Sequence, residues 1–319
     1  MNILNLTADF PETGPRDLLW WPGLAEARRR LHDDFAGSQS FHFGGALLFP
    51  YANRIRGRAQ ASHQEIEIDW GGEKYLLPAN HLGKLANAEK CAIHGLILNQ
   101  VFQSRLSLSP NDSEITGHQL FRSPAWPSEA KLEVTATLKK ESFHLRFSAT
   151  NVGQKPMPVG MGWHPYWKIP SGKRAQVTLK IPARSRLLVD NYDNVFPTGK
   201  LEPLASGPYD FSKAKSIGEL YLDECFVDLE RNHQGHYVIE LVDAAADYGL
   251  RVTCFSPSIQ AVQVYSPVDS DFVAIEPQFN RVDPFSKIWA GHGGMEILAP
   301  GAVAEYAIKV DVFQPSLAK

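Results

Sequence analysis

The chain has 319 residues, of which 44% are hydrophobic and 21% charged, and its formal net charge is −3 at pH 7. This balance is typical of a folded globular protein and excludes disordered and fibrous proteins. The 32 basic residues are matched by 35 acidic ones, so we expect no nucleic-acid partner. Since no apolar run approaches the ~20 residues that cross a bilayer, we expect no membrane partner either.

One segment near the N-terminus is predicted to be helical. Leu24, Ala27 and Leu31 recur at the spacing of one helix face. The arginines Arg28–Arg30 lie mostly on the other face, so we interpret them as a solvated surface rather than a binding patch.

After this helix the dominant hydrophobic period is two, the period of a strand with one buried face. The run Glu65–Trp70 alternates, meets Gly71-Gly72 and resumes at Glu73–Leu76, which predicts a hairpin. Further alternating or apolar runs cover residues 132–138, 143–149, 237–242, 250–255, 261–265 and 306–312. The stretch Pro197–Pro208 is rich in Pro and Gly and is predicted to be a long surface loop.

Many short strands, 24 Gly, 22 Pro and almost no helix indicate an all-β protein folded as a large antiparallel β-sandwich with one short N-terminal helix. No internal repeat, charge block or Ser/Gly linker divides the sequence. Residues 1–319 are therefore predicted to form a single domain.

Three cysteines, Cys91, Cys225 and Cys254, are far apart in the sequence. Such a small, odd number does not form a disulfide framework, so each is expected to be a small core side chain. The N-terminus lacks the basic start and apolar core of a secretory signal. We therefore expect a cytoplasmic protein, because a reducing compartment suits free thiols.

Three polar residues stand beside strand-like runs. Arg54 follows an apolar strand and the turn-forming Asn53, and its planar guanidinium can bind hydroxyls or a carboxylate. His94 lies between apolar residues and a glycine, and Asp223 leads into an apolar strand. A surface arginine and a structural histidine are the alternative interpretations of the first two.

His164 and Glu276 are the candidates for acid–base chemistry. Three aromatic residues flank the histidine in sequence: Trp163, Tyr166 and Trp167. They indicate either a sugar-sized aromatic pocket or an aromatic core cluster. Glu276 follows a hydrophobic strand and precedes a proline, so we expect it at the strand's end. A partly desolvated carboxylate has a raised pKa and can act as a base, although a solvated acid fits the same pattern.

Together these motifs resemble those of the aldose 1-epimerase (galactose mutarotase) family, in the same order over about residues 41–312. The matching pieces are Asn53-Arg54-Ile55, His94-Gly95, His164-Pro165-Tyr166, Asp223 before a strand that ends in Phe, Glu276-Pro277-Gln278 and the turn Pro300-Gly301. The resemblance implies the galactose mutarotase-like β-sandwich as the fold.

The resemblance also implies an activity: interconversion of the α and β anomers of a free aldohexose, a small-molecule sugar. It implies Glu276 as the base and His164 as the acid, with Arg54, His94 and Asp223 binding the substrate. No cofactor and no metal are implied.

The sequence departs from the family pattern in four places. Residues 1–40 do not show the usual opening hairpin, so we expect its strands to be shortened or replaced by the helix. His94-Gly95 is followed by Leu96 rather than a second glycine, and Asp223 is followed by Glu224 rather than histidine. His292 has no counterpart and is interpreted as a loop histidine.

Three alternatives remain open. Two histidines and a glutamate can form a metal site, but their long sequence separations lack the short spacings of a metal motif. A carbohydrate-binding protein without turnover would use the same sandwich, although binding needs neither the acid nor the base. A hexose-6-phosphate 1-epimerase would need further cations. Arg56 and Arg58 would share a strand face with Arg54 on a continuous strand, but Gly57 predicts a turn that redirects Arg58.

Overall fold

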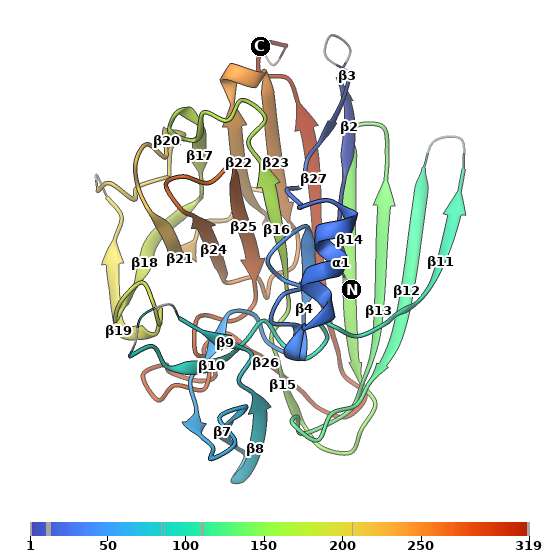
Figure 1. Ribbon diagram of the computed structural model, residues 1–319, viewed down its shortest axis with the longest axis vertical. Coiled ribbons are helices and arrows are strands. Elements are labelled where there is room, and N and C mark those ends of the chain that lie inside the picture. The colour runs from blue at the N-terminus through green and yellow to red at the C-terminus, as the bar shows by residue number, and fades with distance from the viewer. Residues whose placement is uncertain are drawn as a thin grey trace.

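Two large antiparallel sheets pack face to face in a computed structural model of the chain (Figure 1), which describes residues 2–10, 14–83, 85, 87–109, 112–205 and 207–317. The eight-stranded sheet consists, in spatial order, of β1 (Asn2–Ile3), β4 (Gly45–Leu48), β16 (Gly162–Lys168), β25 (Phe272–Gln278), β24 (Ala261–Ser266), β21 (Leu222–Leu229), β18 (Ala183–Val189) and β19 (Pro197–Pro203). The nine-stranded sheet consists of β11 (Gln103–Leu108), β12 (Ser113–Phe121), β13 (Ala130–Leu138), β14 (Ser142–Asn151), β27 (Val303–Phe313), β23 (Tyr248–Cys254), β22 (Tyr237–Asp243), β17 (Thr178–Lys180) and β20 (Lys215–Ser216).

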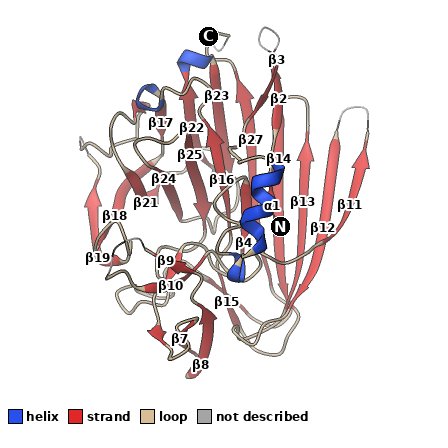
Figure 2. Cartoon of the chain, in the orientation of Figure 1, coloured by secondary structure: helices blue, strands red, loops and turns tan. Residues whose placement is uncertain are grey.

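Smaller elements surround this sandwich (Figure 2). Four small sheets in the described residues pair β2 (Thr7–Phe10) with β3 (Gly14–Asp17), β15 (Met157–Val159) with β26 (Glu296–Leu298), β5 (Arg54–Ile55) and β9 (His81–Leu82) with β10 (Lys90–Ile93), and β6 (Arg58–Ala59) and β8 (Glu73–Pro78) with β7 (Glu65–Trp70). The helical elements are α1 (Leu24–His32) and three 3₁₀ turns at Phe35–Gly37, Arg174–Gln176 and Ala244–Ala246.

Period-two alternation explains the core between the two large sheets. On β13 and β14 the alternating positions Leu132, Val134, Leu145 and Phe147 are buried. Burying one face of each sheet removes these apolar side chains from water and holds the layers together. The predicted all-β, antiparallel sandwich with a short N-terminal helix is confirmed.

The helix α1 forms where predicted, but the apolar face predicted for it is not buried along its length. Ala27 is buried, whereas Leu24 is 51% exposed and Leu31 is 41% exposed. The hairpin β2–β3 precedes the helix, so the opening strands are not replaced by it. Residues 1 and 11–13 of this segment lie outside the described part of the chain.

The predicted hairpin at Glu65–Leu76 is confirmed as β7–β8. Gly71 and Gly72 have φ values of 57° and 79°, a left-handed conformation that suits glycine in a two-residue turn. The predicted loop Pro197–Pro208 is wrong in its first half, because β19 (Pro197–Pro203) pairs with β18. Proline is tolerated there because β19 is an edge strand and begins at Pro197.

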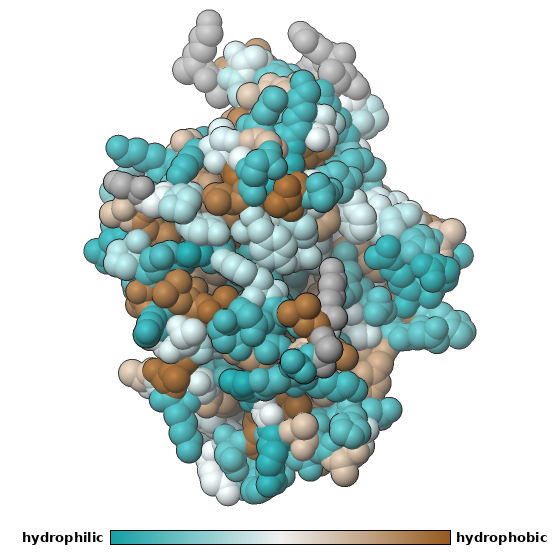
Figure 3. All heavy atoms as spheres, turned by 60° about the vertical axis from the view of Figure 1, so that its left-hand side comes forward, coloured by the Kyte–Doolittle hydropathy of each residue, from teal (hydrophilic) through white to brown (hydrophobic). Residues whose placement is uncertain are grey.

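Cys91, Cys225 and Cys254 are buried and unpaired, as expected of core side chains. In the described part of the chain, no helix combines the length and apolar character required to cross a membrane. Hydrophilic side chains cover most of the face shown in Figure 3, with hydrophobic ones in small separate groups.

Candidate active site

Four neighbouring strands of the eight-stranded sheet, β16, β25, β24 and β21, supply the floor of a cavity. Each strand supplies one polar residue that points away from the sandwich core into this cavity: His164, Glu276, Gln263 and Asp223. Gln263 lies directly opposite Glu276 across the β24–β25 pair. Strand alternation therefore turns four distant sequence positions into one polar row.

Alternation also decides between the two interpretations of the aromatic cluster around His164. Trp163 and Trp167 are fully buried and pack edge-on against each other at a ring-centroid distance of 5.5 Å, within the core. Tyr166 lies on the other face, where its ring stacks on His164 at 4.8 Å. The two tryptophans thus belong to the aromatic core, and Tyr166 forms part of the cavity wall.

Glu276 lies inside β25, which corrects its predicted place at the strand's end. The β16–β25 pairing runs through Gly162 with Gln278 and resumes at Tyr166 with Ala274. Between these pairs stand Pro165 and Pro277, which have no N–H to donate to a ladder. The sheet therefore carries the histidine and the glutamate at an interruption of its hydrogen bonding.

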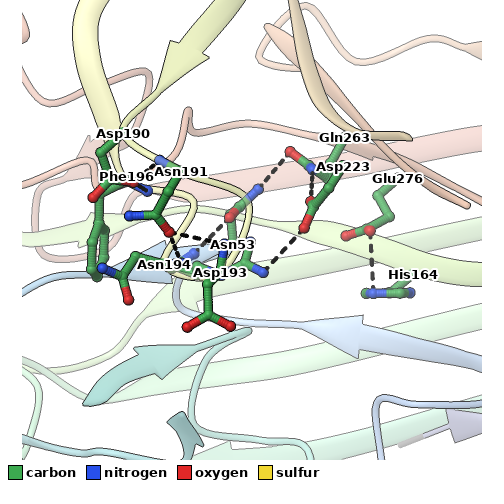
Figure 4. Close-up of polar contacts among 11 residues, drawn as sticks. Asn53, His164, Asp190, Asn191, Asp193, Asn194, Phe196, Asp223, Gln263 and Glu276 are labelled. Carbon is green, nitrogen blue, oxygen red and sulfur yellow. Dashed lines mark hydrogen bonds and ion pairs between the residues drawn. The ribbon is translucent and has the colours of Figure 1, made fainter. Parts of the chain in front are cut away.

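The His164–Glu276 pair has the geometry of an acid–base couple. His164 Nε2 lies 3.2 Å from Glu276 Oε1, and both side chains are buried (Figure 4). The remaining polar atoms, His164 Nδ1 and Glu276 Oε2, have no hydrogen-bond partner among the described residues. Burial raises the pKa of Glu276 well above its usual range and lowers the pKa of His164 to about 3.

A polar chain links the neighbouring strands to the loop before β5. Asn53 Nδ2 donates to Gln263 Oε1 at 2.9 Å, and Gln263 Nε2 donates to Asp223 Oδ1 at 2.7 Å (Figure 4). Arg54 Nη2 lies 3.4 Å from Asp223 Oδ2. Burial raises the pKa of Asp223, while Arg54 opposes that rise. The predicted substrate-binding residues Arg54 and Asp223 are thus brought together.

His94 joins the site through a strained backbone turn. The φ of His94 is 61°, and that of the following Gly95 is 91°. Gly95 also lies so close to Phe49 that a Cβ on it would be 2.1 Å from the Phe49 carbonyl oxygen, so only glycine fits there. The backbone N–H of Asn53 donates to His94 Nδ1 at 3.3 Å, so His94 Nε2 carries the ring proton. The ring packs edge-on against His164 at 4.8 Å.

The segment after β25 holds the backbone that carries Arg54. Asn280 Nδ2 donates to the Ala52 carbonyl oxygen at 2.7 Å, and its Oδ1 accepts the Ala52 N–H at 3.0 Å. The Asp283 N–H donates to the Arg54 carbonyl oxygen at 2.8 Å, and its carboxylate accepts the Arg56 N–H at 3.0 Å. Burial raises the pKa of Asp283 to about 6. One continuous stretch thus connects the glutamate strand to the arginine.

The cavity above this floor has a volume of about 380 Å³, at the lower end of the range for small-molecule sites, ~300–1,000 Å³. Beyond the floor, aromatic and polar side chains line it: Phe41, His42, Asn80, His81, Tyr166, Tyr192, Asp193, Tyr221 and Tyr265. Such a wall offers both hydrogen bonds and ring faces to a molecule the size of one sugar.

Arg56 and Arg58 lie away from this cavity. The chain leaves β5 at Ile55 and enters β6 in a different sheet, which confirms the predicted break at Gly57. Arg56 forms an ion pair with Glu89, and Arg58 lies 2.6 Å from Glu67. Neither arginine lines the cavity.

Three of the site groups meet at the spacing of metal ligands. One ligand atom each from His94, His164 and Glu276 lie within 4.8 Å of one another, so sequence spacing alone did not exclude a two-histidine, one-carboxylate metal site. The hydrogen bond from Asn53 occupies His94 Nδ1 and leaves the proton on Nε2. Metal binding would require this tautomer to change, whereas acid–base chemistry uses it as it stands.

The fold and the cavity define an antiparallel β-sandwich protein with a buried acid–base pair on the outer face of one sheet. A sequence model for the family described as aldose 1-epimerase matches residues 21–310. The chain therefore belongs to the aldose 1-epimerase family.

A sequence relative matches part of the chain. The uncharacterized protein YihR of Escherichia coli is 25% identical over 183 residues, which are 57% of this chain and 54% of that protein. The match thus spans about half the length of that relative.

Solved structures share the fold. A galactose mutarotase-like protein from Clostridium acetobutylicum has a TM-score of 0.77 at 15% identity, covering 98% of this chain and 89% of its own. A GalM/aldose epimerase homologue from Caenorhabditis elegans has a TM-score of 0.71 at 18% identity, covering 98% and 93%. The galactose 1-epimerase of Lactobacillus acidophilus has a TM-score of 0.67 at 18% identity, covering 93% and 85%.

Proposed function

We propose that this protein is an aldose 1-epimerase that interconverts the α and β anomers of an unphosphorylated aldohexose. The observation that carries the proposal is the buried pair of His164 and Glu276, 3.2 Å apart, on the floor of a sugar-sized cavity. Opening a pyranose needs one group to take a proton and another to give one, and this pair provides both.

In the proposed reaction, Glu276 takes the proton of the C1 hydroxyl, and the C1–O5 bond breaks with its electron pair moving to O5. His164 gives a proton to O5, and C1 becomes an aldehyde carbon. Rotation about C1–C2 presents the other face of the aldehyde, and the reverse proton transfers close the ring as the other anomer. No electron is gained or lost, so the reaction needs no redox partner.

The pair starts each cycle with one proton between its members. Burial opposes charge on both groups, which favours a resting pair in which Glu276 holds the proton and both members are neutral. Transfer of that proton to His164 across the existing contact gives the carboxylate base and imidazolium acid that the reaction uses. The total number of protons stays constant during turnover.

Three further residues are proposed to hold the sugar with C1 over this pair. Arg54 and the Nε2–H of His94 donate hydrogen bonds, and Asp223 accepts them from ring hydroxyls. Their positions are fixed before binding by Asn53 and Gln263. Such preorganisation lowers the entropic cost of reaching the reactive geometry.

The charges around the cavity favour a sugar without phosphate. Among the described lining residues Arg54 is the one Lys or Arg side chain, and it faces Asp223. Two further carboxyl groups, those of Asp193 and Glu276, line the same space. A sugar phosphate carries close to two negative charges and requires charge-assisted contacts that these residues do not supply.

A sugar-binding protein without turnover is the second candidate. The pair of His164 and Glu276 disfavours it, because sugar binding requires no proton transfer by an acid or a base. Polarimetry of freshly dissolved α-glucose, α-galactose and glucose 6-phosphate separates the possibilities. An acceleration of the free sugars over the buffer rate supports the proposal; binding without acceleration contradicts it. The free thiols support a cytoplasmic location, which we also propose.

A further inference from the structure

A short loop, residues 190–196, forms one wall of the cavity and is stiffened by its own side chains. Asn191 Oδ1 accepts the N–H groups of Asp193 at 2.9 Å and Asn194 at 2.7 Å. Asp190 Oδ1 accepts the N–H of Phe196 at 3.0 Å (Figure 4). These hydrogen bonds replace water contacts of the loop backbone and restrict its conformations.

The loop is also tied to the segment between β9 and β10. The N–H of Leu85 donates to Asp193 Oδ2 at 3.1 Å, and the N–H of Glu89 donates to Asn194 Oδ1 at 2.9 Å. Gly83 lies so close that a Cβ there would be 2.4 Å from the Asp193 carboxylate. The wall is therefore built of two loops joined to each other.

Tyr192 and Asp193 of this loop both line the cavity, and Tyr192 is the aromatic one. Tyr192 is 44% exposed and lines the cavity together with Tyr221. The two rings meet edge to face, with centroids 5.5 Å apart and an interplanar angle of 71°. An exposed aromatic pair beside hydrogen-bonding groups is the arrangement that packs on the apolar C–H face of a sugar ring.

The hydroxyl of Tyr192 is held by a buried ion pair on the other face of the sheet. It donates to Glu224 Oε1, and Glu224 is 1% exposed. Arg186 Nη1 lies 2.6 Å from Glu224 Oε2, and the Arg186 guanidinium lies 3.7 Å above the ring of Tyr209. Because Glu224 follows Asp223 on β21, consecutive residues face opposite sides and serve the cavity and this anchor respectively.

We propose that Tyr192 contacts the substrate, stacking its ring on the sugar at the end of the cavity away from the acid–base pair, and that Glu224 and Arg186 are positioning residues for it. A buried ion pair is expensive to desolvate and adds little net stability. Holding one half-exposed ring in a fixed orientation gives the pair a role at the site. The inference rests on the proposed function and extends it to a substrate that presents an unsubstituted pyranose face.

The test measures KM and kcat by polarimetry on the sugar that the wild-type protein turns over. Tyr192→Ala should raise KM about tenfold with kcat within about twofold of wild type, because the ring binds ground state and transition state alike. Tyr192→Phe keeps the ring and loses the anchor, so KM should rise about threefold. Tyr75→Phe is the matched control, since it removes a tyrosine–carboxylate hydrogen bond to Glu73 outside the cavity.

A double-mutant cycle separates positioning from a general structural role. Glu224→Gln alone should raise KM, but in the Tyr192→Phe background it should add nothing, because its partner hydroxyl is already absent. Glu224→Gln removes the buried carboxylate from Arg186, which keeps Glu202 as its second partner, and can unfold the sheet edge. In that event Tyr192→Phe, which keeps the ion pair, decides the question alone.

The outcomes distinguish this inference from the proposed function. Unchanged KM in Tyr192→Ala, with normal wild-type turnover, overturns the inference alone. If the wild-type protein binds free aldohexose without turnover, the proposed function is overturned. Calorimetry then decides the inference: Tyr192→Ala should weaken sugar binding about tenfold, and unchanged binding overturns it. A wild type that neither binds nor turns over these sugars overturns both.

Discussion

Replacing Glu276 by Gln should abolish the catalysed reaction and leave the protein folded. The two side chains have the same shape, and Gln can keep the 3.2 Å contact to His164 Nε2 with its amide. It cannot accept the C1 hydroxyl proton. Loss of a general base lowers rates by about 10²–10⁴-fold, which raises the barrier by about 3–5 kcal/mol.

Stability should move in the opposite direction to activity. Burial raises the pKa of Glu276, so its ionised form is disfavoured in the folded state. The free energy of unfolding of wild type therefore falls as pH rises toward and through that raised pKa. Gln carries no charge at any pH. We expect its midpoint of thermal unfolding to equal or exceed that of wild type in mildly alkaline buffer.

The assay is the initial optical-rotation decay of fresh α-aldohexose, corrected for the spontaneous rate, together with the far-ultraviolet circular dichroism spectrum. Glu133→Gln on β13 is the matched control, because Glu133 is exposed on the nine-stranded sheet and pairs with Lys131. His164→Asn should lose activity to a similar extent. A rate near wild type in Glu276→Gln would refute its role as base.

Three further expectations can be tested separately. Between pH 4 and pH 8, wild type should lose up to about 3 kcal/mol of unfolding free energy relative to Asp283→Asn. The cause is that the Asp283 carboxyl, with a pKa of about 6 when folded, ionises at lower pH in the unfolded chain. An equal change in unfolding free energy for the two proteins between these pH values would contradict this. Prolonged dialysis against a chelator should leave activity unchanged, and a loss that a divalent ion restores would overturn the metal-free mechanism. The double variant Arg56→Ala, Arg58→Ala should keep its rate on free aldohexose, since both arginines are paired outside the cavity. The choice of substrate would be wrong if wild type preferred the 6-phosphate by about tenfold and the double variant lost that preference.

Strand pattern was sufficient to predict the sandwich, and motif order led to five proposed site residues that the structure gathers around one cavity. Period-two alternation is a local property, so it placed β13, β14 and β22–β24 to within a few residues. Local spacing was misleading for α1, whose leucines face water while Ala27 makes the buried contact. Whether an amphipathic face is covered depends on the surrounding structure, which the sequence of the helix does not contain.

The missed site residues share one cause: their roles come from pairing across the sheet or between loops. Gln263 is one polar position of an alternating strand, and its link to Asn53 and Asp223 depends on the register of β24. Asn280 acts on the backbone of a segment far away in sequence. The polar face of the strands beside Glu276 was the one signal in the sequence that pointed toward Gln263.

The order β16-β25-β24-β21 has a consequence for how this protein is made. In that row β16 pairs with β25, which lies far away in the sequence, as the pairing of Gly162 with Gln278 illustrates, whereas β24 and β25 are consecutive strands. Closing such long loops is entropically costly, and folding slows as contacts become less local. The chain can therefore acquire much of its strand content before the histidine and glutamate meet. In refolding from denaturant, enzymatic activity should return after the circular dichroism signal. During synthesis, the proposed acid–base pair cannot form before β25, which carries Glu276, has left the ribosome.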